Sequence, residues 1–277
     1  MQIHPTAIVD PSAELSPECE VGPGAIIEAD TVIGPRCRIG PHAFVGRFTR
    51  MGADNVLHIG AVVGNIPQDL KFDRDTVSSL EIGEGNEFRE YCVIHRSAEE
   101  GCATRIGDRC YFMNHSHLGH DGELGNEVIV GASALLAGFV TVGDRAFISG
   151  NTAVHQYCRI GRISMIRGVS GISKDVPPFC IADFRNSLRG LNSVGLQRAG
   201  LDGDTRMALK EVFKMLFRSG LPLADAAREV EDTPHYEVAA VQELVRFCRE
   251  SKRGIVNWMH SDVSDDEWVS RAQVKAE

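Results

Sequence analysis

The sequence predicts a β protein, a parallel β-helix of hexapeptide repeats that is followed by a C-terminal α-helical domain. Three observations lead to this prediction. Aliphatic residues recur every six positions through most of residues 1–172, small residues or glycines hold fixed places between them, and the period becomes helical after Asp204. No α-helix has a period of six, and two-residue strand alternation leaves the small-residue places unexplained.

Each hexapeptide of such a coil supplies one short strand and one corner, so three complete an 18-residue turn with aliphatic residues along its axis. Coils of this kind are left-handed in known hexapeptide proteins. We therefore expect a left-handed parallel β-helix, although the period by itself leaves the hand open. The aliphatic positions are Ile3, Val9, Leu15, Val21, Ile27, Ile33, Ile39, Val45, Met51, Leu57, then Ile82, Phe88, Ile94, then Ile106, Phe112, Leu118, Leu124, Val130, Leu136, Val142, Ile148, Val154, Ile160, Ile166 and Ile172.

The repeat is interrupted twice, and each interruption predicts a loop that leaves the coil. The first loop covers about 64–79 and reads GNIPQDLKFDRDTVSS, and the second covers about 97–104. Long loops in compact domains are often functional, so both loops are candidates for a role in a site.

Two prolines, Pro177 and Pro178, end the repeat, and two amphipathic segments follow. We assign residues 1–185 to the β-helix, 186–254 to the helical domain and 255–277 to an acidic tail. The apolar stripes that predict the helices are Leu209, Val212, Phe213, Leu216 and Phe217, and then Val238, Val241, Leu244, Val245 and Cys248.

Composition narrows the class of protein. Of the 277 residues, 43% are hydrophobic and 24% charged, which is typical of a soluble globular chain, and the net charge of -9 disfavours nucleic-acid binding. No apolar run approaches the roughly 20 residues that span a membrane, and the first residues do not resemble a secretion signal. Eight cysteines stand singly, which favours reduced thiols in the cytosol and argues against disulfides or a cysteine zinc site.

Six motifs follow one another in order: QDLK at 68–71, IHR at 94–96, HLGHD at 117–121, NTAVHQYC at 151–158, SGISKDVPP at 170–178 and LNSVGLQRAG at 191–200. With these motifs the sequence resembles the UDP-N-acetylglucosamine O-acyltransferase family over residues 1 to about 254. The resemblance implies a cytoplasmic enzyme that opens lipid A biosynthesis and uses no cofactor. Such an enzyme moves a 3-hydroxyacyl chain from acyl carrier protein to the 3-hydroxyl of a UDP-sugar. The resemblance also implies a homotrimer with active sites between subunits.

The same resemblance assigns roles to single residues. It makes His120 the general base and Asp121 its support. It places His117, His155 and Gln156 in the substrate pocket, Asp69 and Lys71 on a loop that contacts the substrates, and Asn192 and Arg198 at the nucleotide. Three positions depart from the family pattern. Phe139 stands where a histidine is usual, and some members carry an acidic residue at Val194 and a basic one at Ala199. The exact sugar, including a 3-amino sugar, therefore stays open.

The histidine cluster in NHSHLGHDGELGN, residues 114–126, fits proton transfer. Acyl transfer to a hydroxyl needs a base, and an imidazole with a pKa near 6.5 is suited to that role. Adjacent strand residues point to opposite faces, so a direct His120–Asp121 contact requires a corner of the coil. Two other interpretations remain: a trimeric zinc hydratase with a metal held by three of His95, His115, His117 and His120, and a scaffold without activity.

Two further surfaces follow from the spacing. Residues 18 apart stack in one column, which reads His117, Leu135, Ala153 and Gly171. In the family, a glycine at the last position goes with long acyl chains, so Gly171 predicts a long donor.

On the first C-terminal helix, four basic residues repeat every four positions and lie along one face. This basic face, formed by Arg206, Lys210, Lys214 and Arg218, predicts a contact with the acidic carrier protein.

Overall fold

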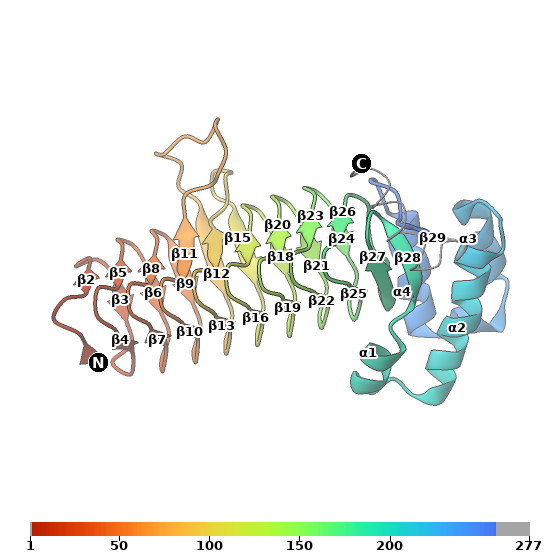
Figure 1. The fold of residues 1–277 in the computed structure, drawn as a ribbon, viewed down its shortest axis with the longest axis horizontal. Coiled ribbons are helices and arrows are strands. Elements are labelled where there is room, and N and C mark those ends of the chain that lie inside the picture. The colour runs from red at the N-terminus through yellow and green to blue at the C-terminus, as the bar shows by residue number, and fades with distance from the viewer. Residues whose placement is uncertain (1, 259–277) are drawn as a thin grey trace, which may run out of the picture.

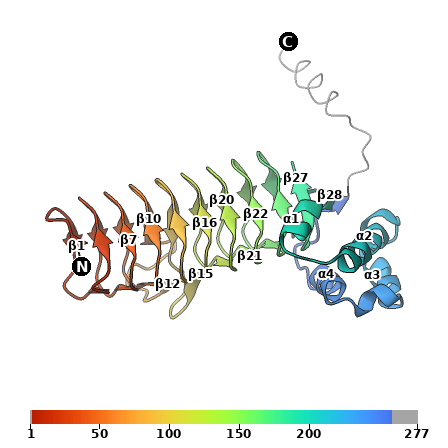
Figure 2. The same cartoon turned by 90° about the horizontal axis from the view of Figure 1, so that it is seen from below.

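The computed structural model describes residues 2–258, whose strands form a long triangular coil with the helices gathered at its C-terminal end (Figure 1, Figure 2). Consecutive strands pass in turn to three different sheets, and each pairs in parallel with the strand one coil further on. Most pairs join residues 18 apart, such as Ile8 with Ile26. The predicted left-handed parallel β-helix is confirmed.

The three sheets run the length of the coil, and we call them A, B and C. Sheet A contains β1 (Gln2–Ile3), β4 (Glu20–Val21), β7 (Arg38–Ile39), β10 (Val56–Leu57), β13 (Glu87–Phe88), β16 (Tyr111–Phe112), β19 (Ile129–Val130), β22 (Phe147–Ile148), β25 (Met165–Ile166), β27 (Cys180–Asp183), β28 (Ser187–Leu191) and β29 (Asn257–Trp258). Sheet B contains β2 (Ile8–Val9), β5 (Ile26–Ile27), β8 (Phe44–Val45), β11 (Val62–Asn65), β14 (Val93–His95), β17 (His117–Leu118), β20 (Leu135–Leu136), β23 (Ala153–Val154) and β26 (Gly171–Ile172). Sheet C contains β3 (Glu14–Leu15), β6 (Val32–Ile33), β9 (Thr49–Met51), β12 (Ser79–Ile82), β15 (Ala103–Ile106), β18 (Glu123–Leu124), β21 (Thr141–Val142) and β24 (Arg159–Ile160).

The axis of the coil is the hydrophobic core. In a two-residue strand the side chains point to opposite faces, so one residue fills the axis and the other lies on the outer surface. In β17, for example, Leu118 is buried, whereas His117 is on the outer side. Ile3 is an exception among the predicted axis residues, with 42% exposure, because no coil covers the N-terminal end.

Both predicted loops leave the coil between sheet B and sheet C. The first follows β11 and the second follows β14, on consecutive coils. Figure 1 shows the first loop projecting far from the coil. The corner between sheets B and C thus carries both interruptions of the repeat.

The C-terminal end departs in detail from the sequence analysis. Residues 187–191, assigned to the helical domain, form β28, which pairs antiparallel with β27 and extends sheet A. Residues 257–258, assigned to the tail, form β29 beside β28. The rest of that tail, 259–277, lies outside the described residues. The helices are α1 (Ser193–Arg198), α2 (Gly203–Arg218), α3 (Leu223–Glu231) and α4 (Ala239–Arg249), with a 3₁₀ turn at Pro234–Glu237.

Among residues 2–258, no helix combines the length and the apolar character that crossing a membrane requires.

Candidate active site

One corner of the coil collects most of the candidate residues. The corner between sheets B and C carries, on successive coils, the loop after β11, the loop after β14, the pair His120–Asp121, then Phe139 and then Tyr157. Because the coil stacks equivalent positions, residues far apart in the sequence become neighbours along this edge. We refer to it as the B–C corner.

His120 and Asp121 are in direct contact. The two atoms His120 Nδ1 and Asp121 Oδ2 are 2.7 Å apart, and the side chains are only 18% and 8% exposed. Asp121 has a φ of 58°, the left-handed conformation that turns the chain at a corner. The contact that the sequence analysis made conditional on a corner is therefore present. A carboxylate accepts only, so Nδ1 carries the hydrogen and Nε2 keeps the free lone pair.

The loop after β14 holds Asp121 from the other side. Ser97 Oγ donates to Asp121 Oδ1, and the amide of Ala98 donates to Oδ2 at 3.1 Å. Burial alone raises the pKa of the Asp121 carboxyl, but hydrogen bonds from His120, Ser97 and Ala98 outweigh burial and lower it. Asp121 is therefore ionised at neutral pH, which suits a partner that stabilises a protonated imidazole.

The His120 ring lies between glycine backbone and an aromatic stack. A side chain on Gly138 would place its Cβ 2.9 Å from His120 Nε2, so the glycine leaves room for the imidazole. The Phe139 ring is edge-to-face with His120 at 5.3 Å and stacks on Tyr157 at 4.6 Å. Sequence reasoning named Phe139 but missed Gly138 and Tyr157. The 18-residue spacing of Phe139 and Tyr157 was the available signal for their stacking.

Two further imidazoles lie beside the pair. The rings of His95 and His117 are 5.1 Å apart, and Nε2 of each is buried without a hydrogen-bond partner. His95 Nδ1 donates to the Ile66 carbonyl at 2.6 Å. Burial, aided by the neighbouring His95, lowers the pKa of His117 to about 4. Both rings thus offer free nitrogen atoms to a polar group of a substrate.

The histidines do not converge as the zinc interpretation requires. Within residues 2–258, no group of three or more His, Cys, Asp or Glu side chains is arranged to hold a metal ion. His115 instead stacks on Tyr91, with ring centroids 5.6 Å apart.

The column predicted from the 18-residue spacing exists on the outer face of sheet B. His117 pairs with Leu135, Leu135 with Ala153, and Ala153 with Gly171. Leu135 is 49% exposed, and a Cβ added to Gly171 would meet nothing within 4 Å. An open apolar track therefore leads from the histidines toward the C-terminal end of the coil.

Asp69 and Lys71 occupy the exposed part of the first loop. The Asp69 carboxylate accepts the amide of Lys71 at 2.9 Å, which makes a local turn, and Leu70 between them is fully exposed. The loop is tied to the coil through Arg96, which donates to the Thr76 carbonyl at 3.0 Å and lies over the Phe72 ring. Arg96 thus anchors the base of the loop, whereas the outer residues of the loop are exposed and project away from the coil.

The predicted nucleotide residues lie on another face. Asn192 and Arg198 line a pocket of about 780 Å³ on sheet A, which also includes Arg145, Phe147 and Met165. The Asn192 side chain is already engaged, because it caps α1 by accepting from Gly195 and donates to the Ile163 carbonyl. In a triangular coil sheet A lies opposite the B–C corner, so a single chain does not bring this pocket to His120.

His155 and Gln156 are on the B–C corner, but both are exposed and lie two coils above His120. Two coil steps amount to roughly 10 Å. Within one chain, His155 and Gln156 therefore do not contact His120 or Asp121.

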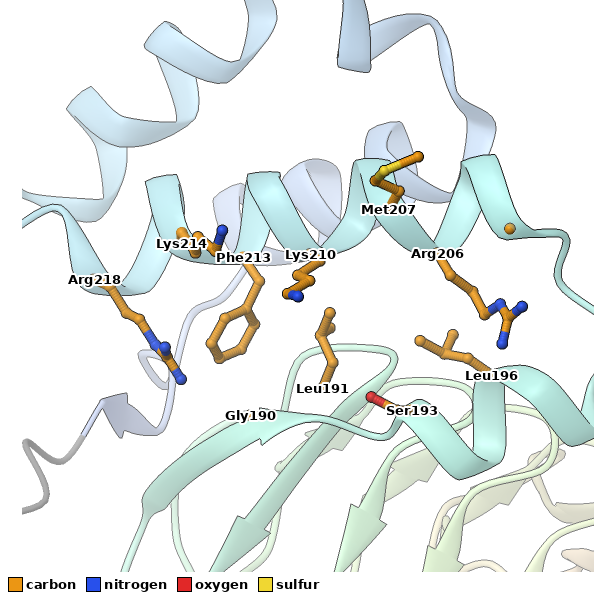
Figure 3. A pocket seen from close by; sticks show the side chains of 11 residues that line it. Gly190, Leu191, Ser193, Leu196, Arg206, Met207, Lys210, Phe213, Lys214 and Arg218 are labelled. Carbon is orange, nitrogen blue, oxygen red and sulfur yellow. The ribbon is translucent and has the colours of Figure 1, made fainter.

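The basic face of α2 lines a pocket of about 490 Å³ together with Leu191, Leu196 and Phe213 (Figure 3). The four basic residues are not equally available. Lys214 pairs with Glu211 at 2.8 Å, and the guanidinium of Arg218 lies 4.0 Å from the centre of the Trp258 ring.

Comparison with known proteins decides the family. A family model described as "Udp N-acetylglucosamine O-acyltransferase; Domain 2" matches residues 175–256, and the bacterial transferase hexapeptide model matches residues 12–47. The acyl-[acyl-carrier-protein]--UDP-N-acetylglucosamine O-acyltransferase of Anaeromyxobacter sp. is 46% identical, with 92% of this chain and 99% of that protein aligned. This chain belongs to the UDP-N-acetylglucosamine O-acyltransferase family. Among solved structures, the acyltransferase of Francisella novicida has a TM-score of 0.88 at 30% identity, covering 92% of this chain and 94% of that one. That of Bacteroides fragilis has a TM-score of 0.87 at 36% identity, covering 92% and 100%.

The three residues that the sequence analysis set apart from the family pattern lie at two separate places. Phe139 contacts His120, so an apolar ring borders the imidazole. Val194, which is 60% exposed, and Ala199 both line the sheet A pocket with Arg198. All three side chains therefore border either His120 or the sheet A pocket, and none of them lies on the axis of the coil.

Proposed function

We propose that this protein transfers a 3-hydroxyacyl chain from acyl carrier protein to the 3-hydroxyl of UDP-N-acetylglucosamine, with His120 as general base. The observation that carries the proposal is the buried His120–Asp121 pair, with its Nε2 lone pair free at the foot of the open column on sheet B. The eight cysteines are free thiols, which agrees with a cytoplasmic enzyme.

The proposed reaction requires one base that later acts as an acid. His120 Nε2 removes the proton of the sugar hydroxyl as the oxygen attacks the thioester carbonyl. Asp121 stabilises the resulting imidazolium through Nδ1. The tetrahedral intermediate collapses with cleavage of the carbon–sulfur bond, and the imidazolium returns its proton to the leaving thiolate. The products are the O-acylated nucleotide sugar and the free carrier thiol.

The column on sheet B is the proposed path of the acyl chain. Three coil steps separate His117 from Gly171, which gives roughly 14 Å of path at about 4.8 Å per step and suits a chain of roughly a dozen carbons or more.

A homotrimer is part of the proposal, because the outer residues of sheet B are largely apolar and those of sheet A are apolar in its C-terminal half. The outer residues of sheet B include Ile8, 64% exposed, and Leu135, and those of sheet A include Ile129, 37% exposed. Sheet C instead carries charged ladders such as Glu81–Arg105–Glu123. A ring in which sheet A of one subunit packs against sheet B of the next buries both apolar faces and leaves sheet C in water. Such packing also brings a neighbour's sheet A pocket toward the B–C corner.

Mass spectrometry of the products tests the proposal directly. The protein is incubated with 3-hydroxyacyl carrier thioesters and either UDP-N-acetylglucosamine or its 3-amino analogue. We expect an ester product from the first acceptor. An amide formed from the analogue alone would move the assignment to the 3-amino sugar, and no product from either would contradict acyl transfer. The variant His120→Ala is expected to lose about 10²–10⁴-fold in rate while the trimer stays folded.

A further inference from the structure

We propose that Ser97 is a positioning residue whose hydroxyl, together with the Ala98 amide, holds the Asp121 carboxylate and thereby sets how strongly His120 accepts a proton. This inference rests on the proposed function, because it concerns the same pair of residues. It gives a role to the second loop, to which neither the family motifs nor the spacing had assigned a functional residue.

The contacts place Ser97 directly behind the pair. Ser97 is fully buried, and its Oγ donates to Asp121 Oδ1. The Glu99 amide donates to Ser97 Oγ at 3.0 Å. The hydroxyl has two acceptors within reach, and Asp121 Oδ1 is closer than the Glu99 carbonyl at 3.3 Å, so its single hydrogen is directed to the carboxylate. At the far end of the loop, Thr104 Oγ1 accepts from the Asp121 amide at 2.8 Å. Both ends of the loop therefore contact Asp121.

The extra residues of the loop make these contacts possible. The axis residues Ile94 and Ile106 are 12 positions apart (106 − 94), where one repeat would separate them by six. The added segment turns back onto the next coil, where it reaches Asp121. Two later corners on the same edge, at Phe139 and Tyr157, have the regular spacing and carry no such segment.

Hydrogen bonds to a carboxylate reduce the charge that it presents to another donor. Oδ1 accepts from Ser97, while Oδ2 accepts from both Ala98 and His120. Loss of the Ser97 hydroxyl would concentrate negative charge on the oxygen that faces the imidazole. The imidazolium would then be more stable, and His120 would hold its proton up to a higher pH.

The other ionisable groups around the pair do not account for such a change. His95 and His117 face it from sheet B, and burial lowers the pKa of both rings. Arg96 and Glu99 belong to the same loop. Arg96 is directed to the Thr76 carbonyl and to Ser78, and the backbone of Glu99 contacts Ser97.

The test is a titration of the His120 imidazole by NMR on protein with ¹³C-labelled histidine, with the His120 signal assigned from its absence in His120→Gln. We expect Ser97→Ala to raise the titration midpoint by about 0.5–1 pH unit. Ser97→Thr keeps a hydroxyl and is expected to leave the midpoint at the wild-type value. The acid limb of kcat/KM against pH should move by the same amount.

Ser78→Ala is the matched control. Ser78 is also buried, but its Oγ donates to the Ser97 carbonyl at 2.5 Å rather than to Asp121. A purely structural role would make the two alanine variants alike in stability and leave the His120 midpoint unmoved in both, and that result would overturn the proposal. If Ser97→Ala does not fold, Ser97→Cys supplies a weaker donor of similar size and is expected to shift the midpoint part of the way.

The titration needs no turnover, so the two proposals can fail separately. A wild-type protein without transfer activity would contradict the proposed function. The effect of Ser97 on the titration midpoint of His120 could still be measured in that protein.

Discussion

Replacing Gly171 with methionine should shorten the preferred acyl chain by a predictable amount. Gly171 is the third coil step above His117, and its missing side chain leaves open space in the column. A methionine there would block the last coil step, so that the open column would end at Ala153. One step of about 4.8 Å corresponds to roughly four carbons of an extended chain.

The energy of this change follows from the buried methylenes. Burying one methylene group contributes about 0.8 kcal/mol to binding, so leaving four of them unburied costs about 3 kcal/mol. That is about two orders of magnitude in the preference between a donor that fills the whole column and one that is about four carbons shorter. We expect the ratio of kcat/KM for the two donors to reverse in Gly171→Met.

The assay compares a series of 3-hydroxyacyl carrier thioesters under identical conditions. Gly171→Ala serves as the small control and should change the profile little. Ala153→Met blocks the column one step lower and should shift the optimum by about a further four carbons. An unchanged profile in both methionine variants would refute the assignment of this column as the acyl path.

Three other predictions concern single features of the site. Gly138→Ala places a Cβ 2.9 Å from the Nε2 of His120, so we expect a fall in kcat of about ten-fold or more with little loss of stability. A change in thermal midpoint alone, with normal kcat, would contradict this. Lys210→Glu combined with Lys214→Glu should raise the Michaelis constant for the carrier protein several-fold and that for the nucleotide sugar hardly at all, and the wild-type affinity should weaken with salt. Equal effects on both constants would indicate damaged folding. Because the pKa of His117 falls from 6.5 to about 4 on folding, the unfolded chain binds more protons between these values. The free energy of unfolding should therefore decrease as pH falls from 6.5 to 4, and less steeply in His117→Phe. If the free energy of unfolding, measured by denaturation at each pH, changed equally with pH in the wild type and in His117→Phe, the prediction would be refuted.

The coil and its columns were predictable because the signal is periodic. The sequence alone places Leu135 and Ala153 between His117 and Gly171, since the repeat fixes both the spacing and the face. It also makes the His120–Asp121 contact conditional on a corner, and the structure supplies that corner. What repeats in the chain is therefore what sequence reasoning recovers.

The aperiodic parts were not predictable in the same way. The contact of Ser97 with Asp121 depends on how an inserted loop folds back, which no spacing encodes. The β27–β28 hairpin depends on a reversal that includes Asn186 at a φ of 57°, for which a short stretch before the helices gave no clear pattern. Asn192 matched a nucleotide motif, yet its amide caps α1 in the structure.

The coil also restricts how the length of this chain can change in evolution. Deleting a single hexapeptide between His120 and Gly171 would rotate everything that follows by one third of a turn and move Gly171 from sheet B to another sheet. Only gains or losses of 18 residues preserve all three faces, and each would lengthen or shorten the column by about 4.8 Å. Other insertions have to leave the coil at a corner, as the two loops do. Variation in acyl length within this architecture should therefore come from point substitutions along the column, with whole coils as the alternative.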